Sequence, residues 1–222
     1  SEGLGAVMKD GKIGFVNEKN EVMIPFGFDY SDKCVILDFG YMFHDGYCVM
    51  TDKSGDVGLI DLNGEWVVEP VYDEIWTPDS NGYRMVVDEG MYGVLDSRCE
   101  ILYPVDYESI EVLSDGFVLA RDGRKWQEDP EGRVIHPFMF DNTYYLNYPV
   151  GYNECGEIQY AFADYAKYEV FGLLGIMNRI TGEPVTPALY ADINMLSEDV
   201  FEVLDPESYD WHLIDVNEYQ PM

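Results

Sequence analysis

The chain has 222 residues and a formal net charge of −30, from 43 acidic and 13 basic side chains. Nucleic-acid phosphate and anionic membrane surfaces would repel such a chain, so we expect neither as a partner and consider a basic protein, divalent cations or simple solubility instead. Apolar residues at 47% and aromatic residues at 15% are enough for a substantial core, which argues against disorder of the whole chain.

One short pattern recurs along the chain: an apolar pentad with glycine at its second position and aspartate or asparagine at its fifth. The cleanest copy is the pentad Val57-Gly58-Leu59-Ile60-Asp61. Repetition at a period of about 35 residues is the signature of a repeat architecture. The other copies begin at Ile13, Tyr92 and Leu174, with a weaker one at Trp211 and a degraded one around Trp126.

Each pentad lies between two further apolar runs, so one unit is expected to be three short strands joined by tight turns. The third run closes with proline, which has no N–H for a strand ladder, and we expect the proline to end that strand. An aromatic residue follows each proline. The repeat prolines are Pro25, Pro70, Pro104, Pro137 and Pro187, and the aromatic residues are Phe28, Tyr72, Tyr107, Phe140 and Tyr190.

A three-stranded meander cannot bury its apolar face alone, so we expect the units to stack into an all-β array that forms a single domain. The units lie near residues 4–43, 44–78, 79–113, 114–140, 168–198 and 199–222, with an insertion at 141–167.

Glycine inside the second strand weakens that strand, so its recurrence indicates a close approach by another group. The repeat glycines are Gly14, Gly58, Gly93 and Gly175. We expect an aromatic ring from the adjacent unit to lie over each of them, with the five aromatic residues that follow the prolines as candidates.

The combination of pentad, turn, proline and aromatic residue resembles the WG-repeat family of bacterial proteins, also called KWG repeats, over nearly the whole chain. The tryptophan that names the family is replaced by Ile13, Val57, Tyr92 and Leu174. It is kept only at Trp211, where histidine replaces the glycine. The resemblance implies a β-repeat fold and a role in protein interaction, and it supplies no catalytic residue.

The units could form an open, curved array or a propeller-like ring. A ring often closes when one terminus completes the sheet begun by the other. The last unit stops at Pro221 and Met222, before a full third strand, and residues 1–4 are too few to supply it. The open array is therefore the expected architecture, with the ring as the alternative.

No set of residues predicts an active site, and we assign no catalytic residue, metal ligand or cofactor. The three histidines are isolated, and no cysteine lies in a CxxC pair. Cys48 and Cys99 are expected to be small buried apolar groups, while pairing among them, Cys34 and Cys155 stays open. The acids that close the pentads are expected to bond turn backbone, at Asp61, Asp96, Asn178 and Asp215.

Two stretches stand out as candidate binding surfaces. The insertion is rich in tyrosine, which buries area at low entropy cost and keeps a polar tip. Its candidates are Tyr144, Tyr145, Tyr148 and Tyr152. The acidic end of the chain contributes Glu198, Asp199, Glu202, Asp205, Glu207 and Asp210. The alternative for the insertion is an ordinary strand or short helix over 159–170 with alternate tyrosines packed inside.

These features predict a non-enzymatic repeat protein that binds another protein through an acidic and tyrosine-rich surface. A basic partner would fit the charge. The alternatives are a carbohydrate-binding or hydrolytic protein with a carboxylate and aromatic cleft, and a structural spacer. Nothing resembles a signal peptide or a membrane span. We expect a cytoplasmic location, or a secreted or periplasmic one if an upstream signal was removed.

Overall fold

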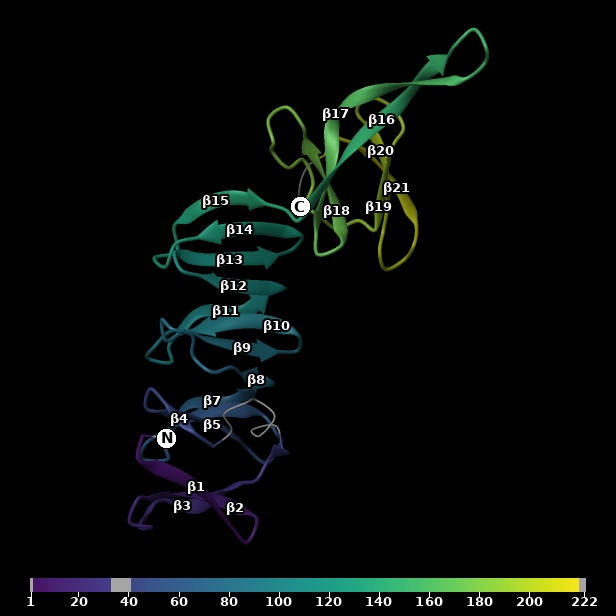
Figure 1. Cartoon of the computed structure of the whole chain (residues 1–222). Coiled ribbons are helices and arrows are strands. Elements are labelled where there is room, and N and C mark those ends of the chain that lie inside the picture. Colours follow the sequence, from purple (N-terminus) through teal and green to yellow (C-terminus); the bar gives the residue numbers. More distant parts are fainter. Residues whose placement is uncertain (1, 33–40, 220–222) are drawn as a thin grey trace. The chain divides into compact units, whose positions relative to one another are not determined.

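A computed structural model describes residues 2–32 and 41–219, and every element with described bounds is a β-strand (Figure 1). The strands form six small antiparallel sheets of three or four strands each, and no sheet in these ranges closes into a barrel. The predicted all-β array of small antiparallel repeats is therefore confirmed. Pro221 and Met222, on which the preference for an open array partly rested, lie outside the described residues, as does Cys34.

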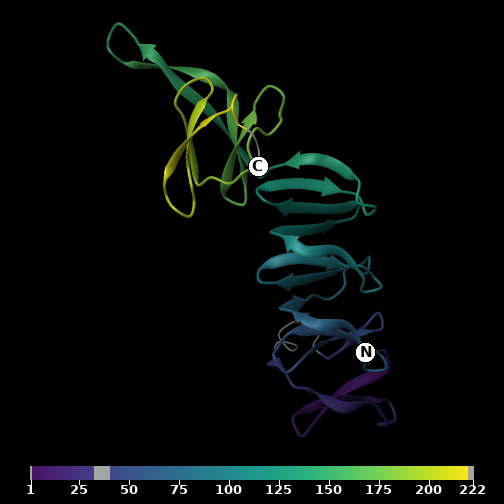
Figure 2. The ribbon, with the colours of Figure 1, turned by 180° about the vertical axis from the view of Figure 1, so that it is seen from behind.

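The chain divides into two compact units, Ser1–Glu108 and Ser109–Met222, and each holds three sheets (Figure 2). In the first unit, sheet 1 consists of β1 (Leu4–Lys9), β2 (Lys12–Asn17) and β3 (Val22–Asp29). Sheet 2 consists of β4 (Phe43–His44), β5 (Tyr47–Thr51), β6 (Val57–Asp61) and β7 (Trp66–Tyr72). Sheet 3 consists of β8 (Glu74–Ile75), β9 (Arg84–Asp88), β10 (Met91–Leu95) and β11 (Ile101–Tyr107).

The second unit repeats this plan with one long hairpin. Sheet 4 consists of β12 (Ser109–Leu113), β13 (Gly116–Arg121), β14 (Arg124–Glu128) and β15 (Val134–Met139). Sheet 5 consists of β16 (Asn142–Tyr152), β17 (Ile158–Val170) and β18 (Leu173–Asn178), and sheet 6 of β19 (Asp192–Met195), β20 (Val200–Leu204) and β21 (Trp211–Asp215). The strands β4, β8 and β12 add a fourth strand that the three-strand pattern did not predict.

The repeat prolines do not end the third strands, and that prediction was wrong. Strand β7 continues past Pro70 to Tyr72, and its register against β6 jumps from Leu59↔Val68 to Val57↔Tyr72. Two residues of β6 thus span four of β7, so the proline lies in a β-bulge, where a missing N–H breaks no ladder hydrogen bond. The same register jump occurs in β3 and β11, which contain Pro25 and Pro104. In β15, which contains Pro137, the jump is shorter, because two residues of β14 span three of β15.

The fifth copy has lost its third strand. Around Pro187 the chain makes only two isolated bridges, Met177↔Pro184 and Leu174↔Tyr190. The side-chain oxygen of Thr186 accepts a hydrogen bond from the N–H of Ile176 at 3.0 Å, which replaces a ladder bond. The continuous third strand expected for this copy is therefore wrong: separate backbone bonds from Val185 and Tyr190, together with the side-chain bond of Thr186, join this segment to β18.

The bulge explains the repeat glycines. A Cβ added at Gly58 would lie 2.5 Å from the carbonyl oxygen of Val68 and 2.8 Å from the nitrogen of Pro70. At Gly14 and Gly93 the third-strand carbonyl is 2.8 and 2.9 Å away. The close approach is therefore confirmed, but it comes from the third strand of the same sheet.

The expected ring from the adjacent unit was wrong. An aromatic ring dominates only at Gly175, and it is the ring of Tyr168, the residue directly opposite on β17 of the same sheet. The bulged backbone reaches the glycines of the other copies first, because the extra residues arch over the neighbouring strand.

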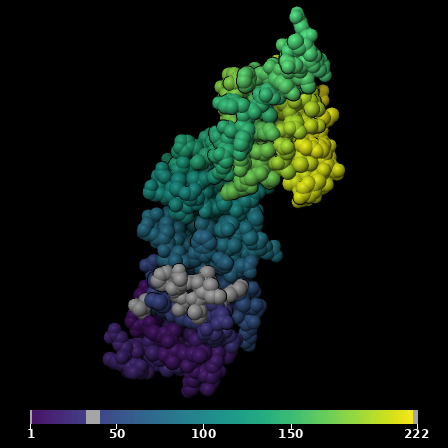
Figure 3. Space-filling view, turned by 45° about the vertical axis from the view of Figure 1, so that its right-hand side comes forward, coloured from purple at the N-terminus to yellow at the C-terminus, as the bar shows by residue number. Residues whose placement is uncertain are grey.

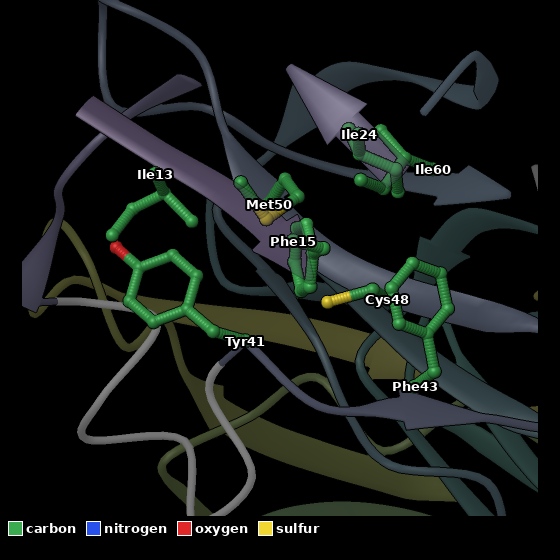
Figure 4. Packing of buried hydrophobic residues seen from close by; sticks show 8 residues of the cluster. All are labelled: Ile13, Phe15, Ile24, Tyr41, Phe43, Cys48, Met50 and Ile60. Atoms are coloured by element: carbon green, nitrogen blue, oxygen red, sulfur yellow. The ribbon is translucent and has the colours of Figure 1, made fainter. Parts of the chain in front are cut away.

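The core of each unit lies between consecutive sheets. Sheets 1 and 2 share eight buried residues, and Phe15 meets Phe43 edge to face with ring centroids 5.0 Å apart (Figure 4). Cys48 is buried in this cluster, and Cys99 is buried between sheets 2 and 3, which confirms their expected role as small apolar groups. The eight residues are Ile13, Phe15, Ile24, Tyr41, Phe43, Cys48, Met50 and Ile60.

Candidate functional site

The predicted insertion is a long β-hairpin, made of β16 and β17. The end of β17 nearest the sheet pairs with β18 from Tyr165↔Asn178 to Val170↔Leu173, so this part is an ordinary strand of the repeat. The distal part, residues 147–162, extends away from the other strands of its unit in both ribbon views and in the space-filling view (Figures 1, 2 and 3). The turn at its tip is built by Asn153, whose side-chain oxygen accepts N–H bonds from Cys155 and Glu157, each at 2.9 Å.

The four tyrosines predicted for this surface have different environments. Tyr145 and Tyr152 are 80% and 73% exposed. Tyr144 is also exposed, but its hydroxyl donates a hydrogen bond to the carboxylate of Glu169. Tyr148 packs against the core cluster between sheets 5 and 6. The hairpin therefore presents two of the four tyrosines freely to solvent.

The distal hairpin also exposes apolar residues that the sequence analysis did not single out. Phe162 is 83% exposed and Tyr160 is 58% exposed. Alternate residues of a strand share one face, and residues directly opposite each other share it too. Ile158 pairs with Tyr152, and Tyr160 pairs with Pro149. We name the surface formed by Tyr152, Ile158, Tyr160 and Phe162 the aromatic face. The alternation Ile158-x-Tyr160-x-Phe162 was the signal that could have located it.

The predicted acids do not gather at one place. Glu198 and Asp199 precede β20, and with Asp164 they surround the hydroxyl of Tyr165. Burial raises the pKa of Tyr165, and the negative charge of Asp199 raises it further. Asp205, Glu207 and Asp210 lie at the other end of β20, in its turn to β21. Glu202, within β20, accepts a hydrogen bond from Asn194 at 3.1 Å.

Asp205 stabilises that turn through its carboxylate. Its carboxylate accepts N–H bonds from Glu207 at 2.9 Å and Ser208 at 2.8 Å. These hydrogen bonds, with that of Ser208 the largest, hold the pKa of Asp205 below its ordinary value. Of the six predicted acids, Glu198 and Asp199 are the pair beside the base of the hairpin.

A cavity of about 540 Å³ lies in the second unit, at the end of sheet 4 where β13 turns into β14. Its walls are mostly apolar, and the charged residues that line it are Arg121, Asp122 and Arg124. A cleft for glycoside hydrolysis would need two facing carboxylates, and this cavity has one. The remaining lining residues are Trp126, Val134, Pro137, Pro187, Leu189 and Tyr219.

A family model described as "WG containing repeat" matches residues 13–33 and 58–92. Two stretches of the chain match WG repeats. The matched ranges take in β2 and β3 of sheet 1, β6 and β7 of sheet 2, and β8, β9 and the start of β10 of sheet 3. The resemblance read from the pentads is therefore confirmed. No curated protein matches the chain.

Solved structures give weaker likenesses. Hsv2 from Kluyveromyces lactis is 10% identical, with 96% of this chain and 70% of that chain covered and a TM-score of 0.32. A eukaryotic initiation factor is 11% identical, with coverage of 96% and 59% and a TM-score of 0.35. A protein of unknown function from Bacteroides caccae is 10% identical, with coverage of 96% and 89% and a TM-score of 0.25. Likenesses this low support no statement about function.

The repeat units share one turn, in which an aspartate or asparagine holds the backbone that follows β2, β6, β10, β14 and β18. The carboxylate of Asp61 accepts N–H bonds from Asn63 at 2.9 Å and Glu65 at 3.0 Å. The expected bonding of these acids to turn backbone is confirmed. The corresponding acceptors elsewhere are Asn17, Asp96, Asp129 and Asn178, and Asp215 accepts one such bond.

Replacing Asp61 by alanine is expected to lower the free energy of unfolding of the first unit by about 1 kcal/mol, since two N–H groups lose their acceptor. Asp61→Asn keeps that acceptor, as asparagine does in the first and fifth copies, and is expected to cost less than half as much. Urea denaturation of both variants measures the difference. Equal losses would mean that charge, not the bonding oxygen, supports the turn.

The pH dependence of these variants follows from the pKa of Asp61, which the N–H of Glu65 and other turn groups hold below its ordinary value of 3.8. A lowered folded-state pKa contributes stability that is present above the unfolded-state pKa and is lost as pH falls through the folded-state value. The stability gap between the parent and Asp61→Ala should therefore narrow below about pH 4.

Within residues 2–32 and 41–219, no group of three or more His, Cys, Asp or Glu side chains is arranged to hold a metal ion. Over the same ranges, no helix has the length and apolar character needed to cross a membrane.

Proposed function

We propose that this WG-repeat protein is non-enzymatic and binds a basic protein partner through the aromatic face of the β16–β17 hairpin. The observation that carries the proposal is the exposure of Phe162, Tyr160 and Tyr152 on one face of a projecting hairpin. Exposed apolar side chains that gather in one patch on a protein surface mark an interaction site. Single exposed apolar residues would need no such explanation.

The hairpin is suited to binding because its residues are held before any partner arrives. The backbone ladder joins β16 to β17 from Asn142↔Glu169 to Tyr152↔Ile158. Aromatic side chains have few rotatable bonds, so little entropy is lost when they are buried in an interface. Buried Tyr and Trp residues are frequent among the residues that dominate binding energy.

Charge supports a basic partner. Residues 134–166 contain no lysine or arginine, and Glu154 and Glu157 flank the tip. At the base of the hairpin lie Asp164, Glu198 and Asp199. An apolar patch bordered by acids favours a partner whose own apolar site is bordered by Lys or Arg, because complementary charge speeds association and sets register.

The test begins with a photo-crosslinking residue in place of Phe162 and, as a control, in place of Leu62, which is also exposed but lies in a turn of the first unit. A protein captured from position 162 and not from position 62 is then purified. We expect Tyr152→Ser with Phe162→Ser to weaken its binding at least tenfold, and Leu62→Ser to leave it unchanged. Raising the salt concentration should weaken the binding of the parent protein to this partner as well.

Three results would contradict the proposal. One is equal capture from both positions. Another is an affinity that the double substitution does not change. The third is a set of bound proteins that is the same at low and high salt, which would remove the argument for a basic partner. Circular dichroism of the double variant checks that the fold is kept.

A further inference from the structure

The 540 Å³ cavity of the second unit has walls that are fixed by backbone contacts. The N–H of Ala188 donates to the carbonyl of Gly123 at 2.9 Å, which joins the 187–189 segment to the β13–β14 turn. Gly123 has no space for a Cβ because the carbonyl of Ala188 lies against it. Flat groups line much of the cavity, namely Trp126, Pro137 and Pro187. The cavity is therefore a preformed apolar slot, of the size that small-molecule sites have.

Two arginines line this cavity from neighbouring strands. Arg121 and Arg124 are directly opposite each other on β13 and β14, and both line the cavity. The carboxylate of Asp122, also in the lining, is 3.7 Å from Arg121 and highly exposed, so water screens that ion pair.

A second, smaller cavity of about 290 Å³ continues the basic region. It shares Arg124, Pro137 and Pro187 with the first cavity and adds Lys125. The Lys125 ammonium is 2.6 Å from the carboxylate of Asp141, so its charge is largely paired. Three of the chain's 13 basic residues thus fall within residues 121–125, in a protein of net charge −30.

We propose that the 540 Å³ cavity binds a small aromatic anion, a flat ring system that carries one carboxylate, sulfonate or phosphate group. The ring lies against Trp126 and the two prolines, and the acid group lies between Arg121 and Arg124. Guanidinium groups bind such oxyanions with paired hydrogen bonds. A polyanion is disfavoured, because the cavity has room for one small molecule and the 43 acids of the chain repel a chain of phosphates.

The probe is 8-anilinonaphthalene-1-sulfonate, whose fluorescence reports binding, and its matched control is N-phenyl-1-naphthylamine, which has the same rings without the sulfonate. We expect the parent protein to bind the sulfonate at least tenfold more tightly than the neutral amine. Arg121→Gln with Arg124→Gln should remove that preference. Arg133→Gln should not, since Arg133 lies on the same unit but pairs with Asp129 and Glu131.

A second control separates this cavity from the aromatic face. Tyr152→Ser with Phe162→Ser should leave sulfonate binding unchanged, and a loss there would overturn the proposal by placing the probe on the hairpin. Equal affinity for the sulfonate and the amine would also overturn it, as would sulfonate binding that is unaffected by the double arginine substitution. Thermal unfolding of each variant confirms that the unit is folded.

Discussion

Gly58→Ala is expected to lower the free energy of unfolding of the first unit by about 3 kcal/mol. The added Cβ would meet the carbonyl oxygen of Val68 at 2.5 Å and the ring of Trp66 at 2.8 Å. The oxygen belongs to the bulged backbone of β7 and cannot move without distorting the register of β6 against β7. Chemical denaturation measures the loss, and hydrogen exchange of peptides over β6 and β7 should show that it is local to sheet 2.

The matched control is Gly5→Ala in β1. No atom lies within 4 Å of a Cβ built at Gly5, and its φ is not positive. The free energy of unfolding of Gly5→Ala is therefore expected to stay within about 0.5 kcal/mol of that of the parent, as for most surface substitutions. If Gly58→Ala is as mild as Gly5→Ala, the bulge does not constrain the repeat glycine.

Tyr168→Ala is expected to lower the free energy of unfolding of the second unit by about 4 kcal/mol, the largest effect in that unit. Truncation of other large buried aromatic side chains has a similar cost. Tyr168 is fully buried, and Phe138 contacts its ring edge to face with centroids 4.9 Å apart. Its hydroxyl donates to the carbonyl of Thr186 at 2.7 Å. Tyr168→Phe keeps the ring and should cost about 1 kcal/mol, the contribution of one hydrogen bond. Tyr145→Ala, at a highly exposed site on the same hairpin, is the control and should cost almost nothing.

The same tyrosine predicts a response to alkaline pH. Burial raises the pKa of Tyr168 above its ordinary value of 10.0. A raised folded-state pKa contributes stability that is complete below the unfolded-state pKa and is lost as pH rises through the folded-state value. The second unit should therefore lose stability above about pH 10, and Tyr168→Phe should lose less. An identical alkaline profile for both proteins would show that Tyr168 does not titrate on unfolding.

The repeat could be found from sequence because each unit carries the same backbone constraints at the same spacing. The repeat glycines correctly predicted a close approach of another group, and Asp61 correctly predicted the turn that follows β6. The partner at Gly58 could not be predicted, because a bulge in β7 depends on the register between two strands. The prediction that Pro70 ends its strand was wrong for the same reason. A missing N–H ends a regular strand, but it is tolerated where the ladder is already interrupted.

The candidate surface was located only in part. Counting tyrosines pointed to the hairpin, and Tyr145 and Tyr152 are exposed there. The register of β16 against β17 shifts between Tyr145 and Asn147, where two residues of β16 span four of β17. The alternation of buried and exposed residues on β17 therefore changes phase there, so Ala163 is buried while Phe162, which no tyrosine count includes, is open to solvent. Tyr148 lies on the same face of β16 as the buried Leu146 and packs toward the core. The two-residue strand β8 was missed because it is too short to show any alternation.

Every sheet is built from one uninterrupted stretch of chain, such as residues 43–72 for sheet 2 and 142–178 for sheet 5. Within residues 2–32 and 41–219, no sheet includes a strand from a distant part of the polypeptide, so the loops that must close during folding are short. Folding of such a chain can start in any sheet and spread to its neighbours, and a sheet can complete its ladder during synthesis before the following one has been made.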